Sequence, residues 1–90
     1  MEIKVFGTKL CPSCNIAVRR VNEAIEKWNG EIRVNYYDME TVDGLTEGAL
    51  NEVMKIPTII LSERGRLVAR WNGEVPEAGE FQEKIGNPSI

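Results

Sequence analysis

Hydrophobic and polar positions alternate over the first residues of the chain and then change to a longer period. Ile3–Phe6 is a short apolar and β-branched run that ends at Gly7, which predicts a strand. Apolar residues then recur at steps of three and four as far as Trp28, which predicts a helix whose apolar face, including Trp28, packs in the core. Pro12 suits the first turn of this helix, where its missing N–H would have no partner, and Asn29-Gly30 predicts the helix end.

A second strand and a second helix follow. Ile32–Tyr37 alternates apolar and polar side chains, which predicts a strand, and the strand–helix–strand order implies that it pairs in parallel with the first strand. After a polar loop, a helix is expected from about Thr46 to Lys55, and Ile56-Pro57 ends it because the residue before a proline is pushed out of helical geometry. We expect four residues of this helix to point inward: Ala49, Leu50, Val53 and Met54.

The last third of the chain predicts a hairpin and a closing helix. Thr58–Leu61 is an almost continuous apolar run, as in a central strand covered on both faces. Arg66–Trp71 alternates as its antiparallel partner after a turn at Ser62–Gly65. Glu77–Ile85 predicts a short helix that Gly86 ends. The predicted class is an α/β fold with the order β-α-β-α-β-β-α and a four-stranded mixed sheet flanked by helices.

Composition limits the function. The 90 residues fit one domain, which we expect to span residues 1–86 and to leave residues 87–90 as a tail. Eleven Lys and Arg against fourteen Asp and Glu give a net charge of −3, which offers no field to attract a nucleic acid. The absence of histidine excludes Ser-His-Asp triads, Cys-His pairs and histidine metal ligands. The sequence shows neither a signal-peptide core nor an apolar run of membrane-spanning length, so we expect a cytoplasmic protein without a membrane partner.

The stretch Cys11-Pro12-Ser13-Cys14 carries the candidate chemistry. Two residues between the cysteines, in the first turn of a helix, allow the two sulfur atoms to come within bonding distance. The free amides and the positive end of the helix favour a thiolate at Cys11, and Lys9 is either an additional stabiliser of that thiolate or a solvated loop lysine. Cys14 falls on the apolar face and should be less exposed. These positions predict that Cys11 attacks a partner's disulfide and that Cys14 resolves the resulting mixed disulfide.

Three interpretations of the two cysteines remain open: a redox dithiol, a shared metal site and inert buried thiols. Zinc takes four ligands, whereas this chain offers two thiolates and no histidine. A metal site would therefore need a dimer or carboxylates such as Glu2 or Asp38. The strand–loop–helix context favours the redox interpretation, with no metal in the site.

The chain resembles the thioredoxin superfamily over residues 1–86. Three features carry the resemblance: the predicted order of elements, Cys11–Cys14 at the start of a helix and Ile56-Pro57-Thr58 before the hairpin. The compact start is closer to glutaredoxins and short archaeal-type thioredoxins than to full-length thioredoxin. Ile56-Pro57-Thr58 resembles the cis-proline loop of that family, which implies a cis bond before Pro57 and a substrate segment paired with the backbone of Ile56. The resemblance implies these substrate-binding residues: Pro12, Ser13, Ile56, Pro57, Thr58 and Gly73.

The resemblance implies an enzyme, a thiol-disulfide oxidoreductase that reduces protein disulfides with no cofactor besides its own dithiol. The expected partners of this monomer are disulfide-containing client proteins, with ribonucleotide reductase among the candidates. The expected electron source is a flavoprotein disulfide reductase or glutathione. Pro12 directly after Cys11 resembles glutaredoxins, whereas Trp71–Pro76 has a single glycine in place of their Gly-Gly pair. A glutathione-dependent glutaredoxin is one alternative. A dimer that binds a metal ion or an iron–sulfur cluster through Cys11 is another.

Overall fold

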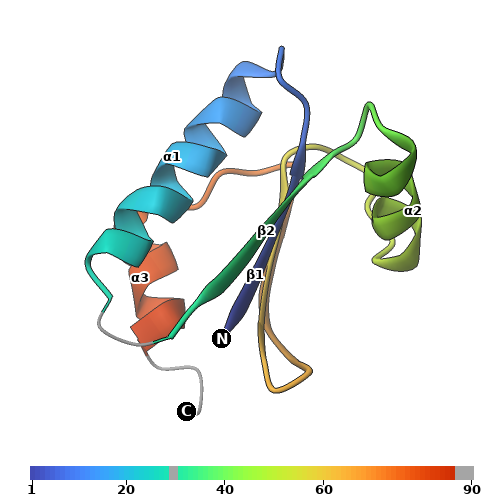
Figure 1. The fold of residues 1–90 in the computed structure, drawn as a ribbon. Helices are drawn as coiled ribbons and strands as arrows, with labels where there is room; N and C mark the ends of the chain where they lie inside the picture. The colour runs from blue at the N-terminus through green and yellow to red at the C-terminus, as the bar shows by residue number, and fades with distance from the viewer. Residues whose placement is uncertain (29–30, 87–90) are drawn as a thin grey trace.

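Helices and strands follow one another in the predicted order β-α-β-α-β-β-α along residues 1–28 and 31–86, the part of the chain that the computed structural model describes (Figure 1). The predicted helix end at Asn29-Gly30 and the predicted tail at 87–90 lie outside these residues. The elements are β1 (Glu2–Gly7), α1 (Pro12–Glu26), β2 (Arg33–Asp38), α2 (Val42–Leu50), β3 (Thr58–Glu63), β4 (Arg66–Asn72) and α3 (Ala78–Gly86).

The four strands form one mixed sheet in the order β2-β1-β3-β4. β1 pairs in parallel with β2, so that Val5 lies opposite Tyr36, and pairs antiparallel with β3, so that Ile3 lies opposite Leu61. β3 and β4 form the antiparallel hairpin. Figure 1 shows α1 and α3 on one side of the sheet and α2 on the other. The predicted four-stranded mixed sheet flanked by helices is therefore confirmed.

The main core lies between the sheet and the α1–α3 layer. Alternation along the strands turns Ile3 and Val5 of β1 toward this layer, together with Ile59 and Leu61 of β3. Trp71 packs edge-on against Phe81 of α3, with 5.5 Å between the ring centroids. Each such side chain contributes about 1.5–3 kcal/mol when it is fully removed from water. The buried face of α1 consists of Cys14, Ala17, Val21 and Ala24.

The second helix differs from the prediction in position and in orientation. It spans Val42–Leu50 rather than 46–55, and it begins at the N-cap Thr41, whose Oγ1 accepts a hydrogen bond from the Gly44 N–H at 3.0 Å. Its buried residues are Gly44 and Gly48. Three of the four residues expected to point inward are exposed, and only Val53 is partly buried: the exposed ones are Ala49, Leu50 and Met54.

Close packing explains this orientation. A Cβ atom at Gly44 would collide with the carbonyl oxygen of Asp38, and one at Gly48 would lie 2.6 Å from the Met39 Cε. The glycine face is therefore the only face of α2 that can approach the end of β2 so closely. Apolar periodicity led to the wrong face because it treats every apolar residue as a core residue.

Two smaller expectations were also wrong. Trp28 is not a core residue: α1 ends at Glu26, so the indole lies beyond the helix and is 37% exposed. The predicted turn at 62–65 is shorter, because Ser62 and Glu63 belong to β3. Arg64 and Gly65 alone connect the hairpin, with φ angles of 53° and 80°. Positive φ at both central residues is typical of a two-residue hairpin turn.

Candidate functional site

The register of the sheet brings the predicted site residues to one edge. Phe6 near the end of β1 lies opposite Thr58 at the start of β3, and Thr58 lies opposite Asn72 at the end of β4. The loop that follows β1, the loop that precedes β3 and the residue that follows β4 must therefore lie at the same edge of the sheet. These segments contain Cys11, Pro57 and Gly73 respectively.

Cys11 and Cys14 are joined by a disulfide at the start of α1, with their Cα atoms 5.1 Å apart. Cys11 is the N-cap residue, and its Sγ accepts a hydrogen bond from the Cys14 N–H at 3.1 Å. Pro12 occupies the first turn as predicted, and no acidic residue lies in that turn to offset the positive helix end. Cys11 is partly exposed, whereas Cys14 is 2% exposed. Cys11 is therefore accessible to another molecule, whereas Cys14 is protected.

Gly7 lies against the buried Cys14. The sequence identified Gly7 only as the end of the first strand and not as a site residue. A Cβ atom at Gly7 would lie 2.9 Å from both the Cβ and the Sγ of Cys14. The last residue of β1 therefore fits against Cys14 only because it has no side chain. A glycine four positions before Cys11 is visible in the sequence, but its role depends on the crossing of β1 and α1.

The Ile56–Pro57 peptide bond is cis, as the resemblance implies. Pro57 is fully buried, and its carbonyl oxygen accepts a hydrogen bond from the Gly73 N–H at 2.7 Å, so two predicted site residues are joined directly. Gly73 has a φ of +76°, which favours glycine. Thr58 is fully buried as well, and its hydroxyl donates to the Lys55 carbonyl at 2.6 Å. Ile56 is at the surface, next to these buried residues.

Arg70 holds the segment that leads into this loop and was not proposed as a site residue. Its guanidinium donates to the carbonyl oxygens of Asn51 at 2.7 Å and Glu52 at 2.9 Å, and also to the Asn72 Oδ1 at 2.6 Å. Hydrogen bonds from a charged donor are stronger than neutral ones. The sequence shows only a charged residue in an alternating strand, so its carbonyl partners could not be found without the fold.

The remaining predicted residues lie at the surface around the disulfide. Pro12, Ser13 and Lys9 are all exposed. The carbonyl of Lys9 accepts a hydrogen bond from the Asn15 Nδ2 at 3.4 Å. Lys9 also borders a largely apolar cavity of about 210 Å³ beside Cys14. The proposed effect of the Lys9 ammonium group on Cys11 stays a prediction.

Two tyrosines line the same cavity. Tyr37 stacks on Phe6 with ring centroids 4.9 Å apart, and the Tyr36 hydroxyl donates to the Asn22 Oδ1 at 2.6 Å. Burial raises the pKa of both phenols above the ordinary value, and the carboxylates of Glu47 and Glu2 raise the pKa of Tyr37 further. Both phenols are therefore neutral near pH 7.

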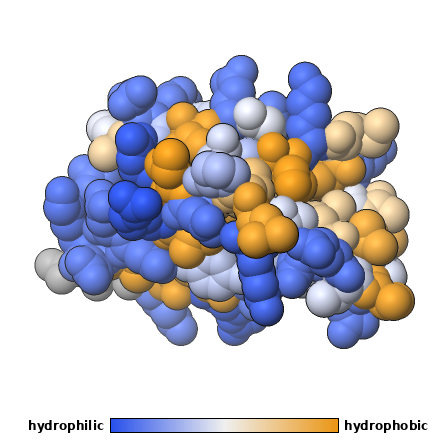
Figure 2. Space-filling model, turned by 90° about the horizontal axis from the view of Figure 1, so that it is seen from above, coloured by the Kyte–Doolittle hydropathy of each residue, from blue (hydrophilic) through white to orange (hydrophobic). Residues whose placement is uncertain are grey.

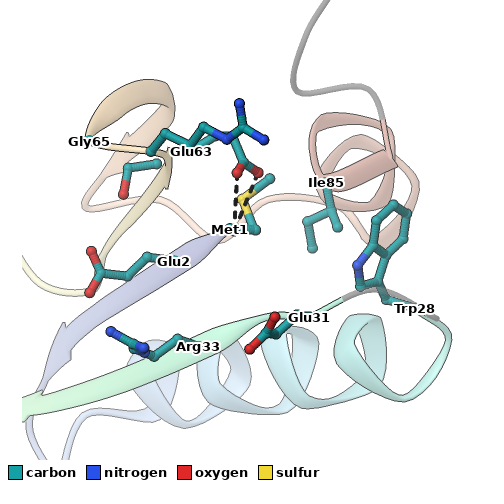
Figure 3. A pocket seen from close by; sticks show the side chains of 10 residues that line it. Met1, Glu2, Trp28, Glu31, Arg33, Glu63, Gly65 and Ile85 are labelled. Atoms are coloured by element: carbon teal, nitrogen blue, oxygen red, sulfur yellow. Dashed lines mark hydrogen bonds and ion pairs between the residues drawn. The ribbon is translucent and has the colours of Figure 1, made fainter.

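A larger hollow of about 600 Å³ lies by the start of β1, at the far end of that strand from the cysteine loop (Figure 3). The Met1 amino group and the Glu63 carboxylate form an ion pair there at 3.3 Å, and Trp28 and Ile85 border it. Neither cysteine lines this hollow, so the dithiol remains the centre of the candidate chemistry.

Two other classes of site are absent from residues 1–28 and 31–86. In that part of the chain, no cluster of three or more His, Cys, Asp or Glu residues is arranged to bind a metal ion. No helix in the same residues has the length and apolar character needed to span a bilayer.

Comparison with known proteins gives a consistent assignment. Residues 1–86 match the family described as thioredoxin domain. No curated protein sequence matches the chain significantly. Among solved structures, a malarial protein has a TM-score of 0.83 at 18% identity, with 99% of this chain and 97% of that chain covered.

Two thioredoxins are similar in the same way. Thioredoxin 1 from Thermosipho africanus has a TM-score of 0.79 at 17% identity, with 97% of this chain and 92% of that chain covered. Thioredoxin O2 from Arabidopsis thaliana in the oxidized state has a TM-score of 0.80 at 14% identity, covering 96% of this chain and 72% of that one. At these identities the solved structures establish the fold, and the match over residues 1–86 establishes that the chain belongs to the thioredoxin domain family.

Proposed function

We propose that this protein is a thiol-disulfide oxidoreductase that reduces disulfides in client proteins, with Cys11 as the nucleophile and Cys14 as the resolving thiol. The family and the Cys11–Cys14 disulfide support a thioredoxin-like redox role. The observation that carries the division of labour is the unequal exposure of the two cysteines, because Cys11 is reachable by another molecule and Cys14 is 2% exposed.

The reaction proceeds in two exchanges. The Cys11 thiolate attacks one sulfur of the client disulfide; the client S–S bond breaks, and the second client sulfur leaves as a thiolate that takes up a proton. The Cys14 thiolate then attacks the Cys11 Sγ and expels the first client sulfur. The client gains two electrons and two protons, and the protein is left with its Cys11–Cys14 disulfide. We further propose a flavoprotein disulfide reductase as the source of the two electrons that restore the dithiol.

The groups around the sulfur atoms suit these steps. The Cys14 N–H directed at the Cys11 Sγ and the positive end of α1 favour a thiolate at Cys11. The loop at Ile56-Pro57 lies at the same edge of the sheet, and the Gly73 N–H holds it by a hydrogen bond to the Pro57 carbonyl oxygen. An extended client segment could pair with the exposed backbone at Ile56 and place its disulfide over Cys11.

Reduction of insulin disulfides by the purified protein, with dithiothreitol as electron source, tests the proposal. Cys11→Ser should abolish the catalysed rate. Cys14→Ser should retain the first exchange and accumulate a mixed disulfide with insulin that mass spectrometry detects. Full activity in Cys11→Ser would rule out Cys11 as the nucleophile.

The alternatives give different results in the same preparations. Turnover of a glutathione mixed disulfide that survives Cys14→Ser would favour a glutaredoxin, because that reaction needs Cys11 alone. Metal or iron–sulfur content in a dimer purified without oxygen would favour the dimer that binds a metal ion or a cluster through Cys11. Under our proposal, the protein purified in this way is a metal-free monomer that forms an intramolecular disulfide on oxidation.

A further inference from the structure

The outer face of α2 is an apolar surface that the proposed redox reaction does not use. This face, which we call the α2 face, consists of Val42, Leu45, Thr46, Ala49 and Leu50, which line one shallow hollow. Val42 is 79% and Leu50 73% exposed. Figure 2 shows apolar atoms gathered on the side of the molecule where α2 lies, at the right of the view. The helix thus faces the sheet with its glycines and the solvent with its apolar side chains.

The segment that carries the α2 face is acidic, with Arg33 and the exposed Lys55 directly outside its two ends. Residues 34–54 contain five of the fourteen acidic residues and none of the eleven basic ones. The five acidic residues are Asp38, Glu40, Asp43, Glu47 and Glu52. Arg70 reaches this segment from β4 and donates hydrogen bonds to the carbonyl oxygens of Asn51 and Glu52, so it keeps one positive charge beside the segment. With five acidic and no basic residues, residues 34–54 by themselves carry a charge of −5, against a net charge of −3 for the whole chain.

We propose that the α2 face docks a basic amphipathic segment of a partner protein, with apolar side chains against Val42, Leu45 and Leu50 and with Lys or Arg beside the acidic residues. Complementary charge orients such a partner and rejects others. If a second copy of the chain docked through the same face, the acidic residues of the two copies would repel each other. The negative charge of an anionic membrane surface would also repel these acidic residues. A segment with one apolar side and basic residues around it is the occupant that matches both the apolar side chains of the α2 face and the acidic residues near it.

The size of the face sets the kind of complex. Nine residues of α2 extend over about 13 Å at 1.5 Å per residue, which matches two to three turns of a partner helix. A contact confined to one nine-residue helix is small beside the interfaces of about 1,200–2,000 Å² that stable complexes bury, so we expect a transient complex. Docking here requires neither sulfur atom and goes beyond the proposed redox function.

The test uses a synthetic helical peptide of about 18 residues with leucines on one face and lysines elsewhere, since shorter isolated helices are only marginally stable. A second peptide has glutamate in place of lysine. Amide NMR shifts of the isotope-labelled protein should map the lysine peptide to α2. The Kd should rise several-fold between about 0.05 and 0.5 M salt because screening shortens the range of the charges.

Variants localise the effect. The double variant Leu45→Ser with Leu50→Ser should weaken binding at least about tenfold, which corresponds to about 1.4 kcal/mol. Leu67→Ser is the matched control, because Leu67 is 65% exposed and lies on β4. The variant with both Cys11→Ser and Cys14→Ser should bind as the wild type does, which separates this proposal from the redox function. Circular dichroism melts verify that each variant is folded.

Several outcomes overturn the proposal. Equal affinity for the glutamate peptide would remove the role of charge, and peptide shifts centred on Cys11 would move the contact to the redox site. A concentration-dependent dimer that the double variant at Leu45 and Leu50 abolishes, seen by sedimentation, would make a second copy the occupant. Binding of neither peptide would refute docking of this class of segment altogether.

Discussion

Replacing Gly7 with alanine tests whether the end of β1 sets the position of the resolving cysteine. The new Cβ would lie 2.9 Å from the Cβ and the Sγ of Cys14, whereas nonbonded carbon atoms prefer about 3.5–4.0 Å. Overpacking of this kind costs about 1–3 kcal/mol, and the lower chain entropy of unfolded alanine offsets about 0.4–1 kcal/mol of it. The midpoints of these two ranges leave a net loss of about 1.3 kcal/mol in the free energy of unfolding.

The loss should differ between the two redox states. In the oxidised protein the Cys14 Sγ is bonded to Cys11 and cannot rotate away from the new methyl group, whereas in the reduced protein it can. If about 1 kcal/mol of the strain acts on the oxidised state alone, the reduction potential rises by about 20 mV, because about 30 mV corresponds to about 1.4 kcal/mol for two electrons.

Equilibration in thiol–disulfide buffers, followed by alkylation of free thiols, measures the potential, and urea unfolding of both redox states measures stability. Gly79→Ala is the control, since a Cβ there meets nothing within 4 Å. It should leave the potential unchanged. A Gly7→Ala protein with wild-type stability, or one whose potential is unchanged or lower, would refute the reasoning.

Three further predictions concern Arg70, the packing of α2 and the Tyr37 phenol. Arg70→Ala should lower the free energy of unfolding by about 1.5–3 kcal/mol, because two carbonyl oxygens lose a charged donor; denaturant melts measure this, and an unchanged stability would contradict it. Gly44→Ala should cost about 1–3 kcal/mol in the same assay, since the methyl group collides with the Asp38 carbonyl, and a gain in stability would show that α2 shifts freely. The raised pKa of Tyr37 means that the folded state holds the phenolic proton more tightly, so this stabilisation is complete below pH 10.0 and is lost as pH rises through the folded pKa. Tyr37→Phe should therefore reduce the decline of stability above pH 10.0 in pH-dependent melts, and an identical decline would disprove the contribution.

Sequence patterns predicted the elements whose buried face is built from apolar side chains. β1, α1, β3 and α3 bury such residues, so short apolar runs located the two strands and steps of three and four located the two helices, within a few positions. The spacing of Cys11 and Cys14 also predicted that their sulfur atoms can bond, and the family resemblance predicted the cis bond before Pro57.

The misplaced or missed features depend on space rather than on polarity. α2 packs through Gly44 and Gly48, and Gly7 makes room for Cys14, yet a missing side chain leaves no trace in a hydrophobic pattern. Arg70 binds carbonyl oxygens that are 18 and 19 positions away in the chain, which no local pattern encodes. Such contacts become visible only when the crossing of distant elements is known.

The central place of β1 has a consequence for synthesis of the chain. Its neighbour β2 follows in the chain after a single helix, so that Ile3 pairs with Val34. Its other neighbour, β3, is farther along the chain, so that Ile3 pairs with Leu61. Loop-closure entropy grows with the length of chain between partners, which favours the β1–β2 pairing first. A nascent chain that has emerged only as far as α2 therefore presents to other chains one edge of a strand that is internal in the complete sheet, and this edge is an open template for aggregation until β3 arrives.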